Sequence, residues 1–244
     1  FLSSFSPPLA SMSMESAEFT LDMEQKVEVP SVDMKMDIKM NMYGSMIVDP
    51  LAMHQKGKVS IAMPGMGLGD EPMEMDMELY LKDDEMYMYE GLMGTWTKAP
   101  STELEALQGQ TPDVSEQMEM YKEYVEDFSV EESDGNYVLK LSADGEGFKE
   151  LTKTLMEETM SQDITSELGD ISQFLDNMEI KTMDIEMVID KDTYDVLSQS
   201  LDMSITIDVE GEVLNLAQKM SMEFSNLNGV DSIEVPQEAI DAAL

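Results

Sequence analysis

The most regular feature of this 244-residue chain is an alternation of apolar and polar residues near its start. Apolar side chains occupy every second position of one stretch: Val32, Met34, Met36, Ile38, Met40 and Met42. Polar residues such as Lys35, Asp37 and Lys39 lie between them. Because successive side chains of a β-strand point to opposite faces, this pattern predicts a strand with one apolar and one polar face.

The same alternation recurs along most of the chain and predicts a series of strands. Their expected ranges are 19–29, 32–48, 59–63, 73–81, 86–90, a short piece around Trp96, 137–141, 183–189, 197–209 and 214–224. Turn signals separate them, among them Pro30, Asp49-Pro50 and the run 190–193. One-sided strands joined by tight turns indicate an antiparallel sheet, here of about nine to eleven strands.

The hydrophobic period changes in the middle of the chain. Thr111 as an N-cap and Pro112 in the first turn predict a helix over 111–125, with Val114, Met118 and Tyr121 on its apolar side. Amphipathic helices are also expected at 148–155 and 164–175, and a short helix at 236–244.

These elements predict an α+β fold. Because the polar sides of the strands are strongly acidic, we expect the helices to cover the apolar side. The predicted architecture is a large curved antiparallel sheet, a half-open barrel, with helices packed on its concave face. Residues 1–14, rich in Ser with Pro7 and Pro8, are expected to form a flexible leader or tether before a single domain at 15–244.

Charge and composition narrow the possible partners. The chain has 52 acidic and 14 basic residues, a formal net charge of -38, and every basic residue is Lys. This balance argues against nucleic acid and against an anionic membrane surface as partners. The chain contains no Cys, which excludes disulfides, thiolate metal sites and Cys nucleophiles. No apolar run approaches the ~20 residues of a membrane span.

Four short stretches carry a family resemblance: the Met-Tyr-Met-Tyr strand 86–89, the Gly-Thr-Trp-Thr-Lys run 94–98, the turn 189–194, and the closing segment 233–236 with Ala239 and Ala242. They resemble Gram-positive surface lipoproteins of uncharacterised function. The domain of that family is similar to LolA-type and LppX/LprG-like lipoprotein carriers. The resemblance implies an exported, lipid-anchored protein at the cell surface with a hydrophobic-ligand cavity. Since this chain starts at Phe1 rather than Met, it is expected to be a processed or trimmed product that a signal peptide and a lipid-anchor Cys could have preceded.

Metal sites were considered because the chain contains 27 Met. Met-x-Met pairs occur at 34–36, 40–42, 73–77, 86–88 and 118–120, and thioethers suit Cu(I). In a strand, however, Met-x-Met only places two flexible apolar side chains on one face. Asp190, Asp192 and Asp195 are closely spaced, as are Asp134 and Asp144, but neither set has the calcium-loop pattern. His54, the single imidazole, is expected to be exposed in a polar turn.

No catalytic motif is present in the sequence. It contains no Gly-x-Ser-x-Gly elbow, no P-loop, and no Gly-x-Gly-x-x-Gly after a predicted strand. We therefore expect neither an enzyme nor a bound cofactor.

The residues expected to line an apolar pocket lie on strands and helices predicted to meet on the concave face. They are Met75, Met77, Leu79, Tyr87, Tyr89, Trp96, Met118, Tyr121, Phe148, Leu151, Leu155 and Phe174. The favoured function is an exported monomeric binding protein for a lipid or another hydrophobic ligand. One alternative is a surface interaction domain with a filled core and an acidic face for a cationic partner. A more distant alternative is a Met-rich copper binder.

Overall fold

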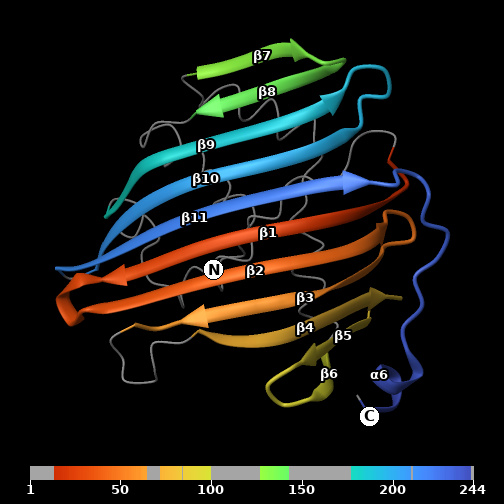
Figure 1. Ribbon diagram of the computed structural model, residues 1–244, viewed down its shortest axis with the longest axis horizontal. Helices are drawn as coiled ribbons and strands as arrows, with labels where there is room; N and C mark the ends of the chain where they lie inside the picture. The colour runs from red at the N-terminus through yellow and green to blue at the C-terminus, as the bar shows by residue number, and fades with distance from the viewer. Residues whose placement is uncertain are drawn as a thin grey trace, which may run out of the picture.

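The computed structural model describes residues 14–64, 72–83, 85–99, 127–142, 177–209 and 211–242. The strands of these residues form one antiparallel sheet of 11 strands (Figure 1). The strands are β1 (Ser16–Val29), β2 (Met34–Ile47), β3 (Ala52–Ala62), β4 (Met73–Lys82), β5 (Glu85–Glu90), β6 (Thr95–Ala99), β7 (Asp127–Ser133), β8 (Asn136–Ser142), β9 (Met178–Asp190), β10 (Val196–Val209) and β11 (Glu212–Ser225). A 3-10 turn, η1 (Pro30–Val32), follows β1, and an α-helix, α6 (Gln237–Ala242), lies near the end of the chain.

The order of strands across the sheet is β6-β5-β4-β3-β2-β1-β11-β10-β9-β8-β7. Two up-and-down series, β1 to β6 and β7 to β11, therefore join where β1 pairs with β11 (Figure 1). The first and last strands of the chain lie in the middle of the sheet, and β6 and β7 form its edges. Such a sheet is complete only when both ends of the chain have paired.

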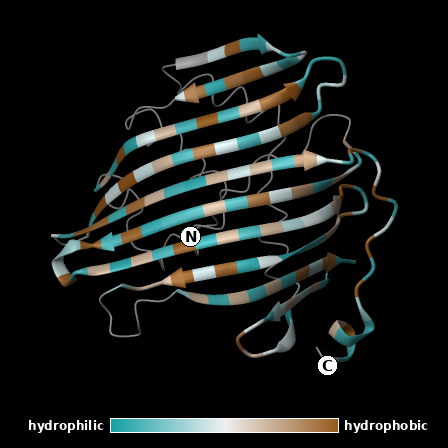
Figure 2. Ribbon diagram, viewed as in Figure 1, coloured by the Kyte–Doolittle hydropathy of each residue, from teal (hydrophilic) through white to brown (hydrophobic). Residues whose placement is uncertain are grey.

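The sheet is one-sided, as the alternation predicts. Figure 2 shows the alternation as hydrophobic and hydrophilic bands along the long strands. Phe19, Met203, Ile205 and Phe224 are buried. Their polar counterparts Asp22, Lys35, Asp76 and Glu186 are exposed. The predicted assignment of alternate residues to an apolar and a polar face is therefore confirmed for these positions.

The apolar positions of the alternating strands were expected to be buried, but several are only half-buried. A buried cluster joins β1, β9, β10 and β11, and Met183, Leu201 and Leu216 belong to it. On β2 and β4, Met42, Met46 and Leu81 are buried. Other apolar-face residues of these two strands are half-buried: Met34, Met36, Ile38, Met40, Met75, Met77 and Leu79. The apolar side of the sheet is therefore best covered over its middle and more accessible toward β4.

Two strand boundaries differ from the sequence prediction. Val32 was expected to begin the second strand, but it lies in η1 with 63% of its surface exposed. Pro30 has no N–H for a strand ladder, and Asp33 turns the chain in the left-handed region with φ of 50°. His54 was expected in an exposed turn, but it lies within β3, whose Lys56-Gly57-Lys58 run resembles a turn in sequence.

The α+β assignment is wrong. The described residues form an open antiparallel sheet, and α6, the one α-helix among them, is not on the concave side. Ala239 of α6 instead packs with Ala52, Tyr80 and Tyr87, which lie on the opposite side of the sheet. The physical reason is that these aromatic residues make part of the nominally polar side apolar enough to receive a helix. The helices predicted at 111–125, 148–155 and 164–175 lie outside the described residues.

Candidate ligand-binding face

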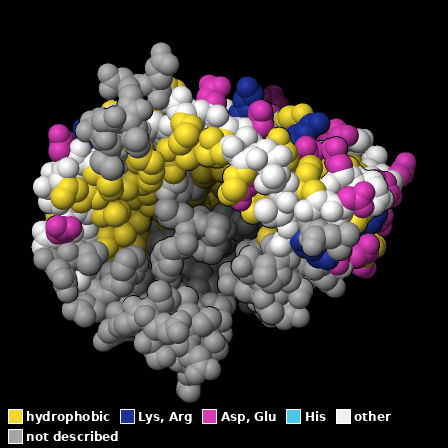
Figure 3. All heavy atoms as spheres, turned by 90° about the horizontal axis from the view of Figure 1, so that it is seen from below, with side chains coloured by type: hydrophobic (Ala, Val, Ile, Leu, Met, Phe, Trp, Pro, Cys, Tyr) yellow, Lys and Arg dark blue, Asp and Glu magenta, His cyan; other side chains and the backbone are white. Residues whose placement is uncertain are grey.

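The candidate site is the concave, apolar side of the sheet, which we call the apolar face. Cross-strand pairing places one continuous row on it, from β8 to β4: Leu141, Ile185, Leu201, Met220, Met23, Met40, Val59 and Met75. The row forms because each strand keeps its apolar residues in the same phase of the pleat. Figure 3 shows apolar side chains gathered on the inner side of the arch and acidic side chains on its outside.

Two glycines shape this face where β2 and β3 pair. A Cβ atom at Gly57 would collide with the main-chain carbonyl oxygen of Asn41, and one at Gly44 would collide with that of His54. Both glycines occupy apolar-face positions of their strands, opposite Met42 and Gln55. Glycine therefore allows β2 and β3 to approach closely on the concave side.

Three buried glutamines interrupt the apolar face. Gln25 and Gln218 are direct cross-strand partners on β1 and β11, 6% and 4% exposed. Gln199 on β10 is 7% exposed and lies between its partners Met187 and Met222. The Gln199 side-chain oxygen, Oε1, is buried and accepts no hydrogen bond from the described residues. Apolar ligand sites commonly contain a few such polar groups, which fix the orientation of the ligand.

The structure places the predicted pocket residues on two different faces. Met75, Met77 and Leu79 lie on the apolar face of β4. Tyr87, Tyr89 and Trp96 lie on the opposite side, in register with Tyr80 and Glu78. The two groups therefore cannot line one pocket between them. Met118, Tyr121, Phe148, Leu151, Leu155 and Phe174 lie outside the described residues.

The aromatic residues of β3 to β6 form a separate cluster on the polar side. The rings of His54 and Tyr80 are stacked with centroids 4.2 Å apart, and Trp96 lies 5.9 Å from Tyr80 and 5.4 Å from Tyr89. The Glu78 carboxylate accepts a hydrogen bond from the Tyr80 hydroxyl at 2.9 Å and lies 2.8 Å from His54 Nε2. Burial and the Glu78 carboxylate raise the pKa of Tyr80.

The closing segment of the chain covers this aromatic cluster. Ile233 and Ala239 pack with Tyr80 and Tyr87, and Lys82 Nζ donates a hydrogen bond of 2.7 Å to the Ile233 carbonyl oxygen. The arrangement has the character of a small second core that fastens the C-terminal segment to the sheet. We assign this cluster a structural role.

The polar side of the sheet centre carries a ladder of alternating charge. Lys39 Nζ lies 2.8 Å from Glu24, and Lys219 Nζ lies 2.7 Å from Asp202. Lys219 is also the cross-strand partner of Glu24, so the ladder crosses β10, β11, β1 and β2. The hydrogen bond and charge of Lys39 hold the pKa of Glu24 below its ordinary value. Such exposed pairs mainly align neighbouring strands and contribute little to stability.

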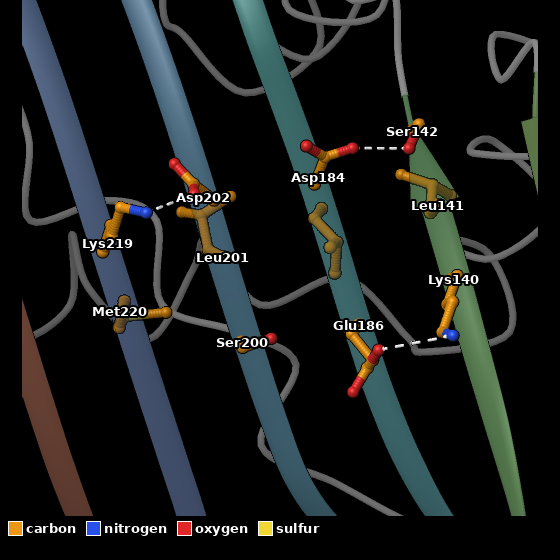
Figure 4. Close-up of a pocket in the computed structure, with 11 residues that line it drawn as sticks. Lys140, Leu141, Ser142, Asp184, Glu186, Ser200, Leu201, Asp202, Lys219 and Met220 are labelled. Atoms are coloured by element: carbon orange, nitrogen blue, oxygen red, sulfur yellow. Dashed lines mark hydrogen bonds and ion pairs between the residues drawn. The ribbon is translucent and has the colours of Figure 1, made fainter.

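A shallow pocket of about 530 Å³ lies beside this ladder, on the same polar side (Figure 4). Its polar lining comes from Lys140, Ser142, Asp184, Glu186, Ser200, Asp202 and Lys219. Lys219 pairs with Asp202, and Lys140 lies 3.9 Å from Glu186. Because both lysines of the lining are already paired with carboxylates, we do not assign the pocket a ligand.

The structure gives no support for a metal centre within its described part. Those residues contain no group of three or more His, Cys, Asp or Glu side chains arranged to hold an ion. Asp190, a calcium candidate, instead accepts hydrogen bonds from the backbone N–H groups of Asp192 and Thr193, both at 2.8 Å. These bonds close the β9–β10 turn and lower the pKa of Asp190. Copper binding by the Met-x-Met pairs stays an untested alternative.

The buried glutamines are the residues that sequence reasoning missed. Their signal was present, because Gln25, Gln199 and Gln218 each occupy a position in the apolar phase of a long alternating strand. A polar residue in that phase is either buried or breaks the strand, so it is informative in both cases. None of the described helices is long and apolar enough to cross a membrane.

Comparison with family models assigns the chain to a family. A family model described as a family of unknown function, DUF6612, matches residues 8–244. A search of curated protein sequences finds no match.

A search of solved structures gives matches at low sequence identity, among them the following three. A lipovitellin structure is 8% identical with a TM-score of 0.42 and covers 93% of this chain, which spans only 27% of the lipovitellin chain. A DUF1329 family protein from Desulfovibrio piger is 10% identical, with a TM-score of 0.24 and coverage of 88% and 86%. A β-barrel-like DUF1849 protein from Brucella abortus is 8% identical, with a TM-score of 0.22 and coverage of 87% and 99%. We base no functional argument on similarities this weak.

Proposed function

The chain belongs to the DUF6612 family of unknown function, and from that premise we propose that it is a binding protein for a lipid or another apolar small molecule. The ligand lies against the apolar face of the sheet. Export and anchoring at the cell surface are part of the same proposal and rest on the lipoprotein resemblance of the sequence. The alternative is an interaction domain whose apolar face is filled by its own chain.

The main support for this proposal is that several side chains of the apolar row are only half-buried. Met23, Met40 and Met75 line a continuous apolar strip, yet each retains accessible surface. Accessible apolar surface gains about 25 cal/mol per Å² when a ligand removes it from water. A bound acyl chain contributes about 0.8 kcal/mol for each CH₂ group that it buries.

The abundance of methionine on this face fits an adaptable site. Methionine has three rotatable side-chain bonds and a polarisable sulfur, so it can repack around ligands of different shape. The cross-strand partners Met23, Met40 and Met220 lie at the centre of the sheet. A rigid core of β-branched residues would adapt less well. The methionine-rich face is therefore suited to a range of apolar ligands of different shape rather than to a single ligand.

A pair of neighbouring substitutions tests the proposal. Met40 lies on the apolar face and Asn41 on the polar face of β2. Met40→Asp places a carboxylate on the proposed site, whereas Asn41→Asp adds the same charge on the opposite side. Binding of an uncharged fluorescent naphthylamine probe should be lost in Met40→Asp and kept in Asn41→Asp.

A third variant, Met40→Leu, separates binding from folding. It conserves apolar volume and should bind the probe as the wild type does. Thermal unfolding of all variants shows whether Met40→Asp remains folded. Failure of the folded wild-type protein to bind any apolar probe would reject the proposal and favour the interaction domain.

A further inference from the structure

Gln199 is a buried polar group without a hydrogen-bond donor among the described residues. Its side chain is 7% exposed, and its Oε1 atom is buried and unpaired within that part of the chain. A buried carbonyl oxygen without a partner costs roughly 1–3 kcal/mol. Stable proteins rarely retain such groups without a role, because an apolar residue of similar size would remove the cost.

The surroundings of Gln199 place this group on the proposed binding face. Met187 and Met222 are its cross-strand partners, and Leu201 occupies the next position of the same phase on β10. Gln25 and Gln218 lie on the same face, four residues further along the strands, which corresponds to about 13 Å. Gln199 is therefore an isolated acceptor at one end of an apolar surface.

The charge of this face determines which headgroups it suits. The lysines at paired positions of the described strands all point to the opposite side: Lys26, Lys35, Lys39, Lys56, Lys58, Lys82, Lys98, Lys140 and Lys219. An ionised carboxylate beside Gln199 would thus lack a cationic partner among these residues. Burying an unpaired charge is far more costly than burying a hydroxyl group that can donate to an amide oxygen.

We propose that Gln199 binds the hydroxyl headgroup of an uncharged amphiphile whose acyl chain extends across β11 to the half-buried Met23 and Met40. This inference rests on the proposed function and specifies its ligand class. The headgroup hydroxyl donates a hydrogen bond to Gln199 Oε1 and satisfies the buried acceptor. Gln199 acts in binding and orientation, and no covalent step is involved.

The test compares two ligands with the same acyl chain, a monoacylglycerol and the corresponding fatty-acid methyl ester, which has no hydroxyl donor. Affinities are measured by displacement of the naphthylamine probe from the wild type, Gln199→Met and the control Gln237→Met, whose exposed side chain lies in α6, away from the apolar face. The preference for the monoacylglycerol should fall about tenfold in Gln199→Met, as expected for one neutral hydrogen bond. It should be unchanged in Gln237→Met.

The outcomes separate this inference from the proposed function. If both ligands bind to the wild type and the preference is the same in Gln199→Met, the assignment of Gln199 is overturned while apolar binding stands. An equal loss of preference in Gln237→Met would also overturn it, because that residue does not lie on the apolar face. If neither ligand nor the probe binds to the wild type, the proposed function itself fails.

Protein stability provides a second readout. Gln199→Met removes the unpaired acceptor, so the ligand-free variant should unfold at the same or a higher temperature than the wild type. Saturating monoacylglycerol should then raise the unfolding temperature less in the variant than in the wild type. A ligand-free variant that is markedly less stable would show that Gln199 is satisfied within the fold and would contradict the proposal.

Discussion

Met23 of β1 and Met220 of β11 lie directly opposite each other on the apolar face, at the seam where the first and last strands of the chain pair. Met220 is 9% exposed and belongs to the central buried cluster, whereas Met23 is half-buried. The pairing of β1 with β11 joins the two halves of the sheet into one continuous surface. The stability of the sheet therefore depends on contacts between the N-terminal and C-terminal strands.

Truncation of the seam methionines should reveal this dependence. Met220→Ala is expected to reduce the free energy of unfolding by about 2–5 kcal/mol, and Met23→Ala by less, because Met23 retains accessible surface. The double variant should show coupling of at least about 0.5 kcal/mol, since the side chains are neighbours. Denaturant unfolding of the four proteins measures both quantities, and strict additivity would contradict direct packing across the seam.

Methionine-to-leucine substitution tests whether these residues act as packing groups or as metal ligands. Met36→Leu and Met75→Leu conserve volume at half-buried positions, so each should cost less than about 1.5 kcal/mol. A Cu(I) titration of the wild type should show no tight stoichiometric site. Tight binding that disappears in these variants would instead support the copper alternative.

Gly57 should be intolerant of a side chain. A Cβ atom there meets the main-chain carbonyl oxygen of Asn41, which can move only if the β2–β3 pairing moves. Gly57→Ala is therefore expected to destabilise the protein by about 1–3 kcal/mol in denaturant unfolding. Ser60→Ala in the same strand is the control and should have a small effect. Equal, small effects would show that the close strand approach is not required.

The Tyr80 hydroxyl should make stability sensitive to alkaline pH. Burial, with the hydrogen bond to Glu78, raises the pKa of Tyr80 in the folded protein above its value in the unfolded chain, which is about 10. The unfolded state thus loses this proton first. The contribution to stability is complete below about pH 10 and decreases as pH rises further.

Tyr80→Phe removes that alkaline loss. The unfolding free energy of the variant should depend less steeply on pH above about pH 10 than that of the wild type. Tyr43→Phe serves as the control because Tyr43 is 52% exposed. Identical alkaline dependence in Tyr80→Phe and the wild type would contradict the role assigned to the Tyr80 environment.

The sheet was predictable from sequence because most strands keep one hydrophobic phase over many residues. The alternation around Met36 and Met203 specified both strand and face. β7 was missed, since it is an acidic edge strand whose Val130 is 52% exposed and which lacks a sustained apolar phase. The predicted start of the second strand at Val32 was wrong for a local reason. Pro30 and the left-handed conformation of Asp33 place a turn within a continuing apolar pattern, and the strand begins at Met34.

The candidate site was only partly predictable. Alternation correctly grouped Met75 with Met77, but it gave no information about which face of β5 and β6 continues the apolar face of β4. Tyr87 and Trp96 were therefore grouped with the wrong neighbours, although the pairing of Tyr80 with Tyr87 places them on the opposite side. A residue's phase within a strand follows from sequence, whereas register between strands depends on turns and long-range pairing.

The most direct test of ligand binding at the apolar face is native mass spectrometry of the purified protein after incubation with a monoacylglycerol. Lipid extraction of the same sample identifies the bound molecule. We expect a lipid adduct on the wild type that is retained in Asn41→Asp and lost in a folded Met40→Asp variant. The absence of any adduct on the wild type, or equal adducts on both variants, would contradict ligand binding at the apolar face.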